Sequence, residues 1–538
     1  MPLELSLPSG QVQLANMDLP EAEPLKKDTA VAKKRTFKEK FQHLKDNITL
    51  EPTLACYVIP SVLSKLATQN LNLDKACRVN KNYGDAVCDA LLAREGTNHR
   101  DEELAVQQLI AGMESWKTII LTAIPSFLIL FLGAWSDRTR KRKICILLPI
   151  VGELLVCISN IVNVYYFHEL PAQVTMFFEA FFPAITGSWI TTYMGAFSYI
   201  ADISDEESRT FRTGVLNLCL TAGAPIGSAI SGILLQKLGY YGVFCLSSVM
   251  YLFSIVYGFI NIKDPEMLVT EKPREPVNES SGVWGFLKSF FDVNHVKATL
   301  EVAFKKGPNN RRTKSILVLA SIAFIYGPYC GEFSVRYLFA RYKFNWDALM
   351  FSFYNTFYIC MHLLGALISI SLFSRRWQWD DSVLGLISSS SKLVGALATG
   401  LARNSLEMYL AIAVETFNAT SYTAMRSISS KLVTSDELGK MVAVFNLAEI
   451  VTYMVFSPIY SWTYMMTVKT DAGIVYYISA VLTILPLIFF SWFYRQHKKT
   501  MGMKATQSNE KVPPTENSKK NEEALINSIE GVEEMIMC

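Results

Sequence analysis

Long apolar runs separated by short polar segments dominate the chain, and this pattern predicts a protein that crosses a membrane many times. An apolar run of about 20 residues can span a bilayer as a helix. In the first half the runs predict spans at residues 51–68, 119–132 and 144–166, a fourth ending near 201, a fifth around 222–232 and a sixth over 241–260. Six more are expected at about residues 315–340, 349–373, 382–401, 406–426, 441–464 and 473–494.

Polar segments divide these spans into two groups. The chain turns abruptly polar after the sixth span, with several prolines and pairs of basic residues, which is typical of a linker. Within it, the apolar positions of residues 284–304 predict an amphipathic helix under the membrane. The two ends of the chain are charged and are predicted to be disordered tails. The predicted order is tail, bundle, linker, bundle and tail, at residues 1–47, 48–262, 263–313, 314–496 and 497–538.

A repeated motif relates the two groups of spans. The segment Ser204–Leu218 begins Ser-Asp-Glu and ends Val-Leu-Asn-Leu, and the segment Ser435–Leu447 begins Ser-Asp-Glu and ends Val-Phe-Asn-Leu. Each stands directly before an apolar run, at corresponding places in the two groups. Related halves of this kind are typical of secondary transporters. The predicted fold class is therefore an all-α membrane protein, with twelve transmembrane helices in two related six-helix bundles.

The composition agrees with a protein that lies mostly in lipid. Hydrophobic residues make up 51% of the chain, aromatic residues 12% and charged residues only 18%. The formal net charge is +3, and the cations gather on one side of the predicted spans, so no nucleic-acid partner is expected. The first 45 residues are polar, and no cleavable signal peptide is expected.

A short basic segment between the second and third spans sets the orientation. Five of the last six residues of the segment 133–143 are cationic, which places it in the cytosol together with both chain ends. Gly133 allows two helices to approach closely. Asp137 is expected to be held by an arginine or a helix N-terminus, in a contact that breaks when this side of the protein opens. The alternative is a basic loop that only follows the positive-inside rule.

The cysteines fall into two classes. Most of the ten lie in apolar runs, where they act as small packing residues. Cys77 and Cys88 instead lie together in the polar segment after the first span, which the orientation places outside the cytosol. A disulfide between them is therefore expected. No group of cysteines and histidines has the spacing of metal ligands, and no metal or cofactor is expected.

Ionisable residues inside predicted spans are candidates for function, because a charge inside a membrane is costly. Arg426, at the end of the tenth span, can hold an anion or a gate carboxylate; the alternative is a side chain that only reaches the membrane boundary. Glu332 and Arg336 have the spacing of a pair on one helix face. Lys392, in a run of serines and glycines, can face a central cavity. Other candidates in apolar runs are Glu153, Glu179, Glu415, Glu449 and His362.

The basic segment resembles the signature of the major facilitator superfamily. That signature lies between the second and third helices of the family and is matched here by Gly133, Asp137 and Arg138. Arg140 departs from it, because the superfamily usually has a second glycine at this place. The resemblance implies two bundles that expose a central site to one side of the membrane at a time, and a role for Asp137 in that movement.

A narrower resemblance is to solute carrier family 46, the group of the proton-coupled folate transporter and the thymic stromal cotransporter. It rests on Arg426 with residues 430–433, and on residues 201–204 with 209–212. It implies a role for Arg426 in substrate and proton handling, and adds Arg209 to the gate. The folate-importing branch uses an acidic residue in the fifth helix and a histidine in the seventh.

This chain lacks both features of the folate-importing branch. Asn217 occupies the place in the fifth helix, and no histidine lies between residues 314 and 340. Folate is therefore not the expected substrate, whereas muropeptides and cyclic dinucleotides, which relatives import from endolysosomes, stay open.

The sequence as a whole predicts a secondary active transporter. It is expected to move a small organic anion into the cytosol by proton-coupled symport, with the proton gradient as driving force. Its expected setting is the lipid bilayer of the plasma membrane or of endolysosomes, as a monomer or weak oligomer. No catalytic triad, phosphate loop or paired-carboxylate motif occurs, so an enzyme is not expected. The alternative is a transport-inactive membrane scaffold, or a ligand-presenting protein with the same fold.

Overall fold

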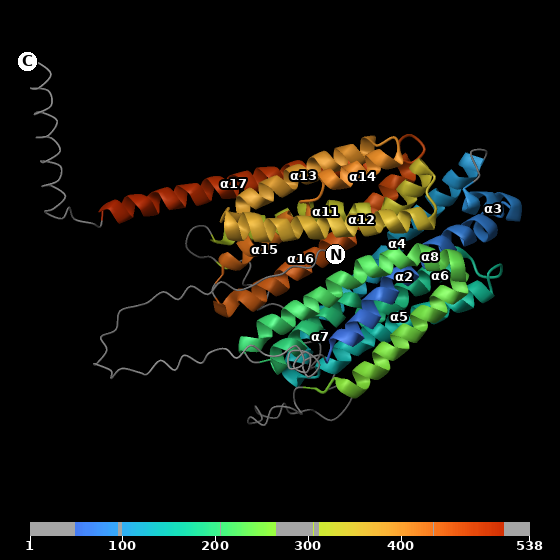
Figure 1. The fold of residues 1–538 in the computed structure, drawn as a ribbon, viewed down its shortest axis with the longest axis horizontal. Helices are drawn as coiled ribbons and strands as arrows, with labels where there is room; N and C mark the ends of the chain where they lie inside the picture. Colours follow the sequence, from blue (N-terminus) through green and yellow to red (C-terminus); the bar gives the residue numbers. More distant parts are fainter. Residues whose placement is uncertain are drawn as a thin grey trace, which may run out of the picture.

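The protein is described by a computed structural model that covers residues 49–94, 99–204, 206–264, 305, 311–433 and 435–510. The first half contains α2 (Glu51–Lys75), the π-helix η1 (Ala76–Asn80), α3 (Asp85–Ala93), α4 (Arg100–Thr139), α5 (Arg142–Tyr165), α6 (Ala172–Thr186), α7 (Ser188–Ile203) and α8 (Glu206–Asn261). The second half contains α11 (Arg311–Phe344), α12 (Ala348–Ile368), η5 (Ser369–Arg376), α13 (Asp381–Leu401), α14 (Ser405–Val414), α15 (Ala419–Lys431), α16 (Ser435–Thr467) and α17 (Ile474–Glu510). Figure 1 shows the two halves as bundles that lie side by side.

These helices make twelve membrane crossings, as predicted. Eight described helices are long and apolar enough to cross a membrane. One of them, in α8, is interrupted at Gly239, whose φ of 63° is not helical, and therefore crosses twice. Three further crossings are made by α2, by α6 with α7, and by α14 with α15. The chain is thus an all-α membrane protein with two related six-helix bundles.

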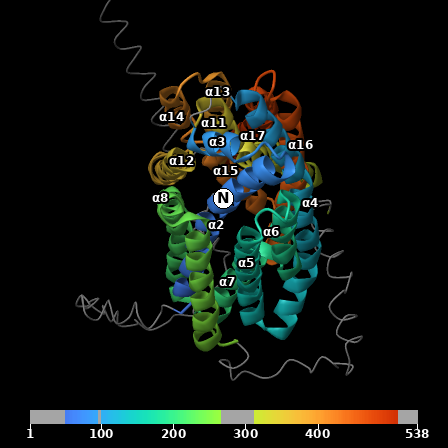
Figure 2. The ribbon, with the colours of Figure 1, turned by 90° about the vertical axis from the view of Figure 1, so that its right-hand side faces the viewer.

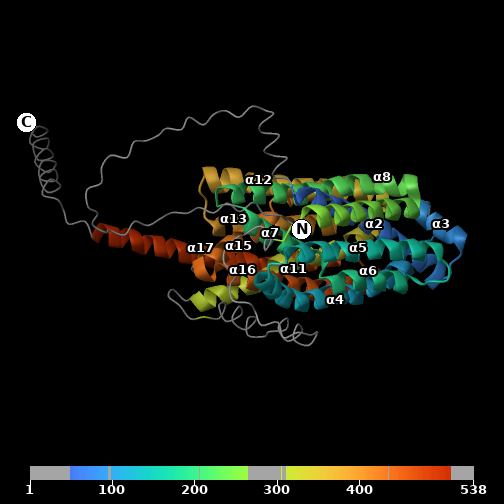
Figure 3. The same cartoon turned by 90° about the horizontal axis from the view of Figure 1, so that it is seen from below.

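The two ends of the bundles are named here by what lies at each. The disulfide face carries α3 and the disulfide between Cys77 and Cys88, whose Cα atoms are 5.9 Å apart. Figure 2 views the molecule from this end. The terminal face is the opposite end, where α2 begins and where α17 extends beyond the bundle (Figure 3). The structure therefore contains the disulfide that the sequence predicts.

The fourth and tenth crossings are each broken near the middle, at corresponding places in the two halves. Gly187 adopts a φ of 92° between α6 and α7. The turn of residues 415–418 separates α14 from α15. Hydropathy alone predicts one continuous span in each case. Paired breaks matter, because secondary transporters build their binding sites where interrupted helices present free backbone groups to a cavity.

The predicted basic loop after the second span is mostly helical. Helix α4 continues to Thr139, so that the turn before α5 consists of Arg140 and Lys141. Arg140 ends α4 in the left-handed region, with a φ of 52°. Glycine adopts this conformation without steric cost. The backbone therefore has the shape that suits a glycine, although this chain carries an arginine there.

Several helices extend beyond the predicted spans. Helix α4 begins at Arg100, so much of the polar segment after the first span is helical. Helix α17 continues to Glu510, so residues 497–510, predicted as part of a disordered tail, are helical; no proline interrupts the chain between residues 487 and 512. The predicted tail 1–47 and the predicted amphipathic helix of the linker lie outside the described residues.

Candidate functional site

Three charged side chains, from two helices and the break of the tenth crossing, meet inside the second half. Lys392 of α13 donates hydrogen bonds to Glu332 of α11 at 2.6 Å and to Glu415 at 2.9 Å. All three side chains are buried, with 2–5% of their surface exposed. Glu415 begins the break of the tenth crossing, so this group, the Lys392 cluster, connects the break to two neighbouring helices. Contact between opposite charges offsets part of the cost of removing them from water.

Arg336 does not pair with Glu332, contrary to the prediction from their spacing. Its guanidinium lies over the ring of Tyr358 in α12, with Cζ 3.8 Å from the ring centroid. Its Nη2 atom has no hydrogen-bond partner among the described residues. Lys392, from another helix, reaches Glu332 instead. With Arg336 included, this part of the second half buries two cations, Lys392 and Arg336, and two carboxylates, Glu332 and Glu415. Their charges therefore balance.

The serine run of α13 holds the break of the tenth crossing. Ser388 Oγ lies 2.7 Å from the carbonyl oxygen of Phe417 and 2.8 Å from that of Asn418. The hydroxyl, with its single proton, donates to one of these two carbonyls at a time, at a place where the helix is interrupted. Gly365 of α12 packs directly on the break, since a Cβ atom there would lie 1.9 Å from the carbonyl oxygen of Thr416. Lys392 consequently lies in a closely packed region, not in the open cavity that the sequence suggested.

A second group of charges lies in the first half. Lys117 of α4 pairs with Glu114 at 2.7 Å and with Glu179 of α6 at 3.0 Å. Lys65 of α2 and Glu153 of α5 interact electrostatically with this group and with each other. These five residues form the Lys65 cluster. It contains three carboxylates and two lysines, so one carboxylate is in excess when all five are ionised.

Lys65 differs from the other lysines of these two clusters because it is exposed. It lies inside a membrane-crossing helix, and its Nζ atom is 3.9 Å from the ring centroid of Phe333 in the other half. Within the described residues it forms no hydrogen bond and no ion pair. An exposed ammonium between two bundles faces a water-accessible space, because lipid would not solvate it. Lys65 therefore lies between the two halves, with its ammonium over a ring of the second half.

Contacts between the halves gather toward the disulfide face. The Tyr337 hydroxyl of α11 donates to Asn70 Oδ1 of α2 at 2.7 Å. The Tyr464 hydroxyl of α16 donates to Gln107 Oε1 of α4 at 2.8 Å. Buried apolar residues of both halves also form a joint core at this end. These contacts join the two halves near the disulfide face.

Arg426 contacts the repeated motif of the second half. Its Nη2 atom donates a hydrogen bond to Asn446 of α16, and its Cζ lies 5.5 Å from the ring centroid of Phe445. Asn446 occupies the place in its motif that Asn217 occupies in the first half. Asn217 is buried in α8. Each half thus carries an asparagine at this place, and an arginine binds the one in the second half.

The predicted gate residues lie at the terminal face. Gly133 faces α7, where a Cβ atom would lie 3.2 Å from Met194 Sδ, so the two helices approach closely at this point. The backbone of Asp137, Arg138 and Arg209 is helical, but their side chains lie outside the described ones.

Arg142 joins three helices at the same end. Its Nε atom is 2.8 Å from Asp202 Oδ2 of α7, and its Nη1 atom donates to Ser136 Oγ of α4 at 2.9 Å. The side chain is only 8% exposed, which makes this ion pair stronger than one on the surface. Sequence reasoning assigned Arg142 only to the basic loop.

Sequence reasoning also missed Lys65 and Lys117. Each is a single lysine within a run of apolar residues, which is the signal that selected Lys392. Their carboxylate partners lie on other helices or one turn away, so the sequence alone did not reveal the cluster.

The chain was compared with known protein families. Residues 107–413, more than half of the chain, match the family described as Major Facilitator Superfamily. A probable peptidoglycan muropeptide transporter of Drosophila melanogaster is 24% identical, over 84% of this chain and 86% of that protein. A lysosomal proton-coupled steroid conjugate and bile acid symporter of Gallus gallus is 23% identical, over 83% and 93%. Solute carrier family 46 member 2 of Canis lupus familiaris is 24% identical, over 66% and 75%.

Solved structures share the fold. The human organic anion transporter TETRAN superposes with a TM-score of 0.53 and 13% identity, over 82% of this chain and 99% of that one. The peptide transporter POT in complex with sulfate gives a TM-score of 0.53 and 13% identity, over 81% and 93%. At this identity the likeness concerns the arrangement of the helices.

Proposed function

Since the chain belongs to the major facilitator superfamily and, within it, to solute carrier family 46, we propose that it is a proton-coupled symporter that carries a small organic anion into the cytosol. The family consists of membrane transporters, so an enzymatic reaction is not the activity of this fold. The two bundles would enclose a central cavity at Lys65 and expose it to one side of the membrane at a time.

The observation that supports an anionic substrate is the exposed ammonium of Lys65. Lys65 is the exposed lysine of the Lys65 and Lys392 clusters, and among the described residues its ammonium lies between the halves without a hydrogen-bonded counter-ion. A fixed positive charge in a poorly solvating cavity attracts an anion more strongly than the same charge does in water. A carboxylate or sulfate group of the substrate would bind there.

Glu153 offers a route for coupling to protons. It has no hydrogen-bond partner among the described residues, and it interacts electrostatically with Lys65. While Glu153 is ionised, it competes with the substrate for the field of Lys65. A proton on Glu153 removes that competition and also removes the excess carboxylate of the Lys65 cluster. Proton and anion would therefore bind together, which is the requirement for symport.

The proposed direction of transport rests on the different chemistry of the terminal face and the disulfide face. Basic residues gather at the terminal face, among them Arg140, Lys141 and Lys143, which favours a cytosolic position for this face. The disulfide supports an oxidising compartment at the other end. The contacts near the disulfide face support a state in which the cavity is closed to that compartment. In such a state the substrate leaves toward the cytosol.

Uptake into liposomes tests the proposal. The names of the relatives suggest bile acids, steroid conjugates and muropeptides as the first solutes to test. An inward proton gradient is expected to drive saturable accumulation of at least one of them, and Lys65→Gln is expected to abolish it. Lys237→Gln is the matched control, because Lys237 is an exposed lysine near the disulfide face. Equal uptake by both variants would contradict the role of Lys65.

The role of Glu153 requires a separate measurement. Glu153→Gln imitates the protonated carboxyl, so exchange of labelled for unlabelled solute is expected to continue while accumulation driven by the proton gradient is lost. Glu102→Gln removes a carboxylate near the disulfide face and should change neither process. If Glu153→Gln still accumulates solute against its gradient, the coupling proton binds elsewhere. If neither the unmodified protein nor any variant takes up a solute, but the unmodified protein binds partner proteins, the scaffold alternative is favoured.

A further inference from the structure

A cavity of about 710 Å³ opens between the halves at the disulfide face. Helices α2, α3 and α8 line it from the first half, and α11 and α12 from the second. Its polar and aromatic wall includes Asn70, Arg94, Tyr240, Arg341, Trp346 and Asp347. Cavities of this size accommodate small organic molecules. It lies apart from the Lys65 cluster, since neither Lys65 nor its partners belong to its wall.

Two arginines of this wall share one carboxylate. Arg341 Nε donates to Glu103 Oε1 at 3.0 Å, and Arg94 Nη1 donates to Glu103 Oε2 at 3.3 Å. The three side chains are only 5%, 9% and 8% exposed, in the order Arg341, Arg94, Glu103. Two buried cations thus face one buried anion. Asp347 adds a carboxylate to the wall, but its Oδ1 atom is occupied in accepting the Met350 N–H at the start of α12.

Arg94 has hydrogen-bonding capacity that the protein does not use. Its Nε and Nη2 atoms are buried and have no hydrogen-bond partner within the described part of the chain. An unpaired buried donor on a charged group is costly, so a ligand that accepts from it gains more than it would at the surface. Burial and the nearby charge of Arg341 lower the pKa of Arg94 to about 10, although Glu103 opposes both effects. An added anion would favour the charged form of Arg94.

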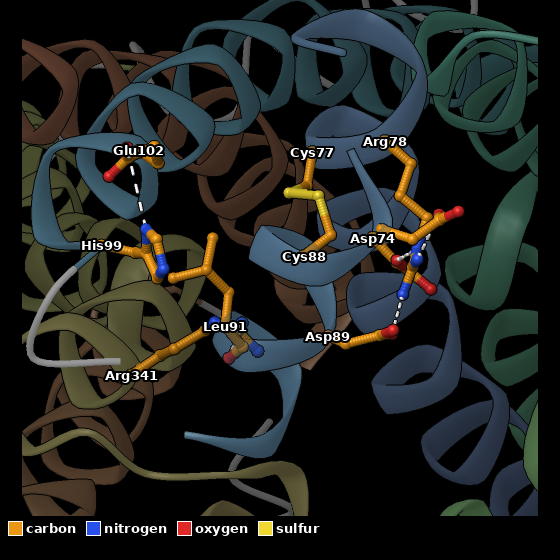
Figure 4. Close-up of a disulfide and its surroundings, with 10 residues drawn as sticks. Asp74, Cys77, Arg78, Cys88, Asp89, Leu91, His99, Glu102 and Arg341 are labelled. Atoms are coloured by element: carbon orange, nitrogen blue, oxygen red, sulfur yellow. Dashed lines mark hydrogen bonds and ion pairs between the residues drawn. A yellow bond between two sulfur atoms is a disulfide. The ribbon is translucent and has the colours of Figure 1, made fainter. Parts of the chain in front are cut away.

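The position of Arg94 is fixed by the disulfide segment. Arg94 follows α3 directly, and the Cys77–Cys88 disulfide ties α3 to the start of η1 (Figure 4). Arg78 strengthens this connection through ion pairs with Asp74 and Asp89. The site is therefore held in place before a ligand arrives, which reduces the entropy that binding costs.

We propose that this cavity is a second binding site, for an organic anion with a flat apolar body. Arg94 binds the carboxylate or sulfate of the ligand through the fork of its Nε and Nη2 atoms. Arg341 adds a nearby positive charge from the second half, while its own Nε and Nη2 atoms donate to Glu103 and to the Leu91 carbonyl. Tyr240 and Trp346 contact the apolar body. Because Arg94 belongs to the first half and Arg341 to the second, the bound anion joins the two halves at the disulfide face. The site does not depend on the proposed transport mechanism.

Binding of a fluorescent aromatic anion, umbelliferyl sulfate, tests the proposal directly. Purified full-length protein carrying Lys65→Gln is titrated in detergent, so that the central cation does not contribute. The sulfate is expected to bind, whereas its uncharged methyl ether is not. Arg94→Gln is expected to weaken binding about tenfold or more, as for the loss of one charged hydrogen-bonding partner. Arg100→Gln is the matched control, because this exposed arginine stacks on Tyr342 outside the cavity wall.

A second variant covers the case in which Arg94→Gln fails to fold. Ala93 is exposed and lines the cavity, so Ala93→Trp fills the space without disturbing a buried contact. It is expected to abolish binding while the thermal unfolding temperature stays unchanged. Undiminished binding to Arg94→Gln or to Ala93→Trp, or equal binding of the sulfate and the methyl ether, would overturn the proposal. If a variant loses binding at this second site but still takes up solute into liposomes, only the second site is affected and the proposed transport function is retained.

Discussion

Glu332 on α11 pairs with Lys392 on α13 at 2.6 Å, although Arg336 stands one turn further along the same helix as Glu332. The ion pair therefore connects helices instead of stabilising one of them. Since Lys392 also binds Glu415, a single ammonium holds α11, α13 and the break of the tenth crossing together. Loss of this lysine is therefore expected to affect contacts between helices of the second half.

Replacing Lys392 by methionine is expected to lower the free energy of unfolding by about 3–5 kcal/mol, because two carboxylates then stay buried without a counter-ion. Denaturant unfolding of the purified protein, followed by tryptophan fluorescence, measures this change. The double variant Lys392→Met, Glu332→Gln removes one of the stranded charges and should regain part of the loss. Equal losses in the single and double variants would argue against a direct interaction.

Gly365→Ala is expected to destabilise the protein at or beyond the upper end of the usual cost of overpacking, about 1–3 kcal/mol. The new Cβ atom would lie 1.9 Å from the carbonyl oxygen of Thr416, and a backbone atom at the helix break cannot move away easily. Gly214→Ala is the control, since nothing lies within 4 Å of a Cβ atom there. Thermal unfolding in detergent compares the two, and similar unfolding temperatures would show that the break can shift.

Arg140→Gly is expected to stabilise the protein by about 1 kcal/mol relative to Arg140→Ala, because residue 140 has a φ of 52° that favours glycine. Both variants remove the same charge, so their difference isolates the backbone effect. Denaturant unfolding of the two proteins measures it. If the alanine variant is as stable as the glycine variant, the turn can adopt another conformation.

The contact between the linker and α16 is expected to respond to pH only in acid. Glu437 accepts hydrogen bonds from Lys305 at 2.6 Å and from Arg311 at 2.7 Å, which lowers its pKa below the ordinary value of 4.5. The stabilisation is therefore fully present above that value and is lost as the pH falls through the lowered pKa.

Comparison of Glu437→Gln with the unmodified protein measures this dependence. The difference in unfolding free energy should be constant between about pH 7 and pH 5, and should shrink at lower pH. A difference that changes between pH 7 and pH 5 would mean that another group is responsible.

The sequence was sufficient for the outline of the fold. Hydropathy located the crossings, and the repeated motifs around Asn217 and Asn446 identified two related halves. Cys77 and Cys88 could be paired because they lie in one short polar segment on the side opposite the basic loop. These features depend on local composition or on short separations along the chain, and such patterns are visible without coordinates.

The charged clusters could not be predicted to the same extent. Lys392 was selected as an unusual charge, but its partners come from other helices, 60 and 23 residues away in the sequence. Hydropathy predicts that a helix lies in the membrane, but it does not predict which neighbouring helix packs against each of its faces. The breaks of the fourth and tenth crossings were missed for a similar reason. Residues on both sides of each break stay apolar, and only the backbone conformation changes.

The two helix breaks have a consequence for how the protein changes shape. They divide the fourth and tenth crossings into a segment near the disulfide face, α6 or α14, and a segment near the terminal face, α7 or α15. Tilting α7 or α15 about its break leaves the hydrogen bonds inside every helix intact. The breaks are therefore the places where each bundle can bend with the smallest loss of helical hydrogen bonds, and a bend of the tenth crossing would also have to release its contacts with Ser388 and Gly365.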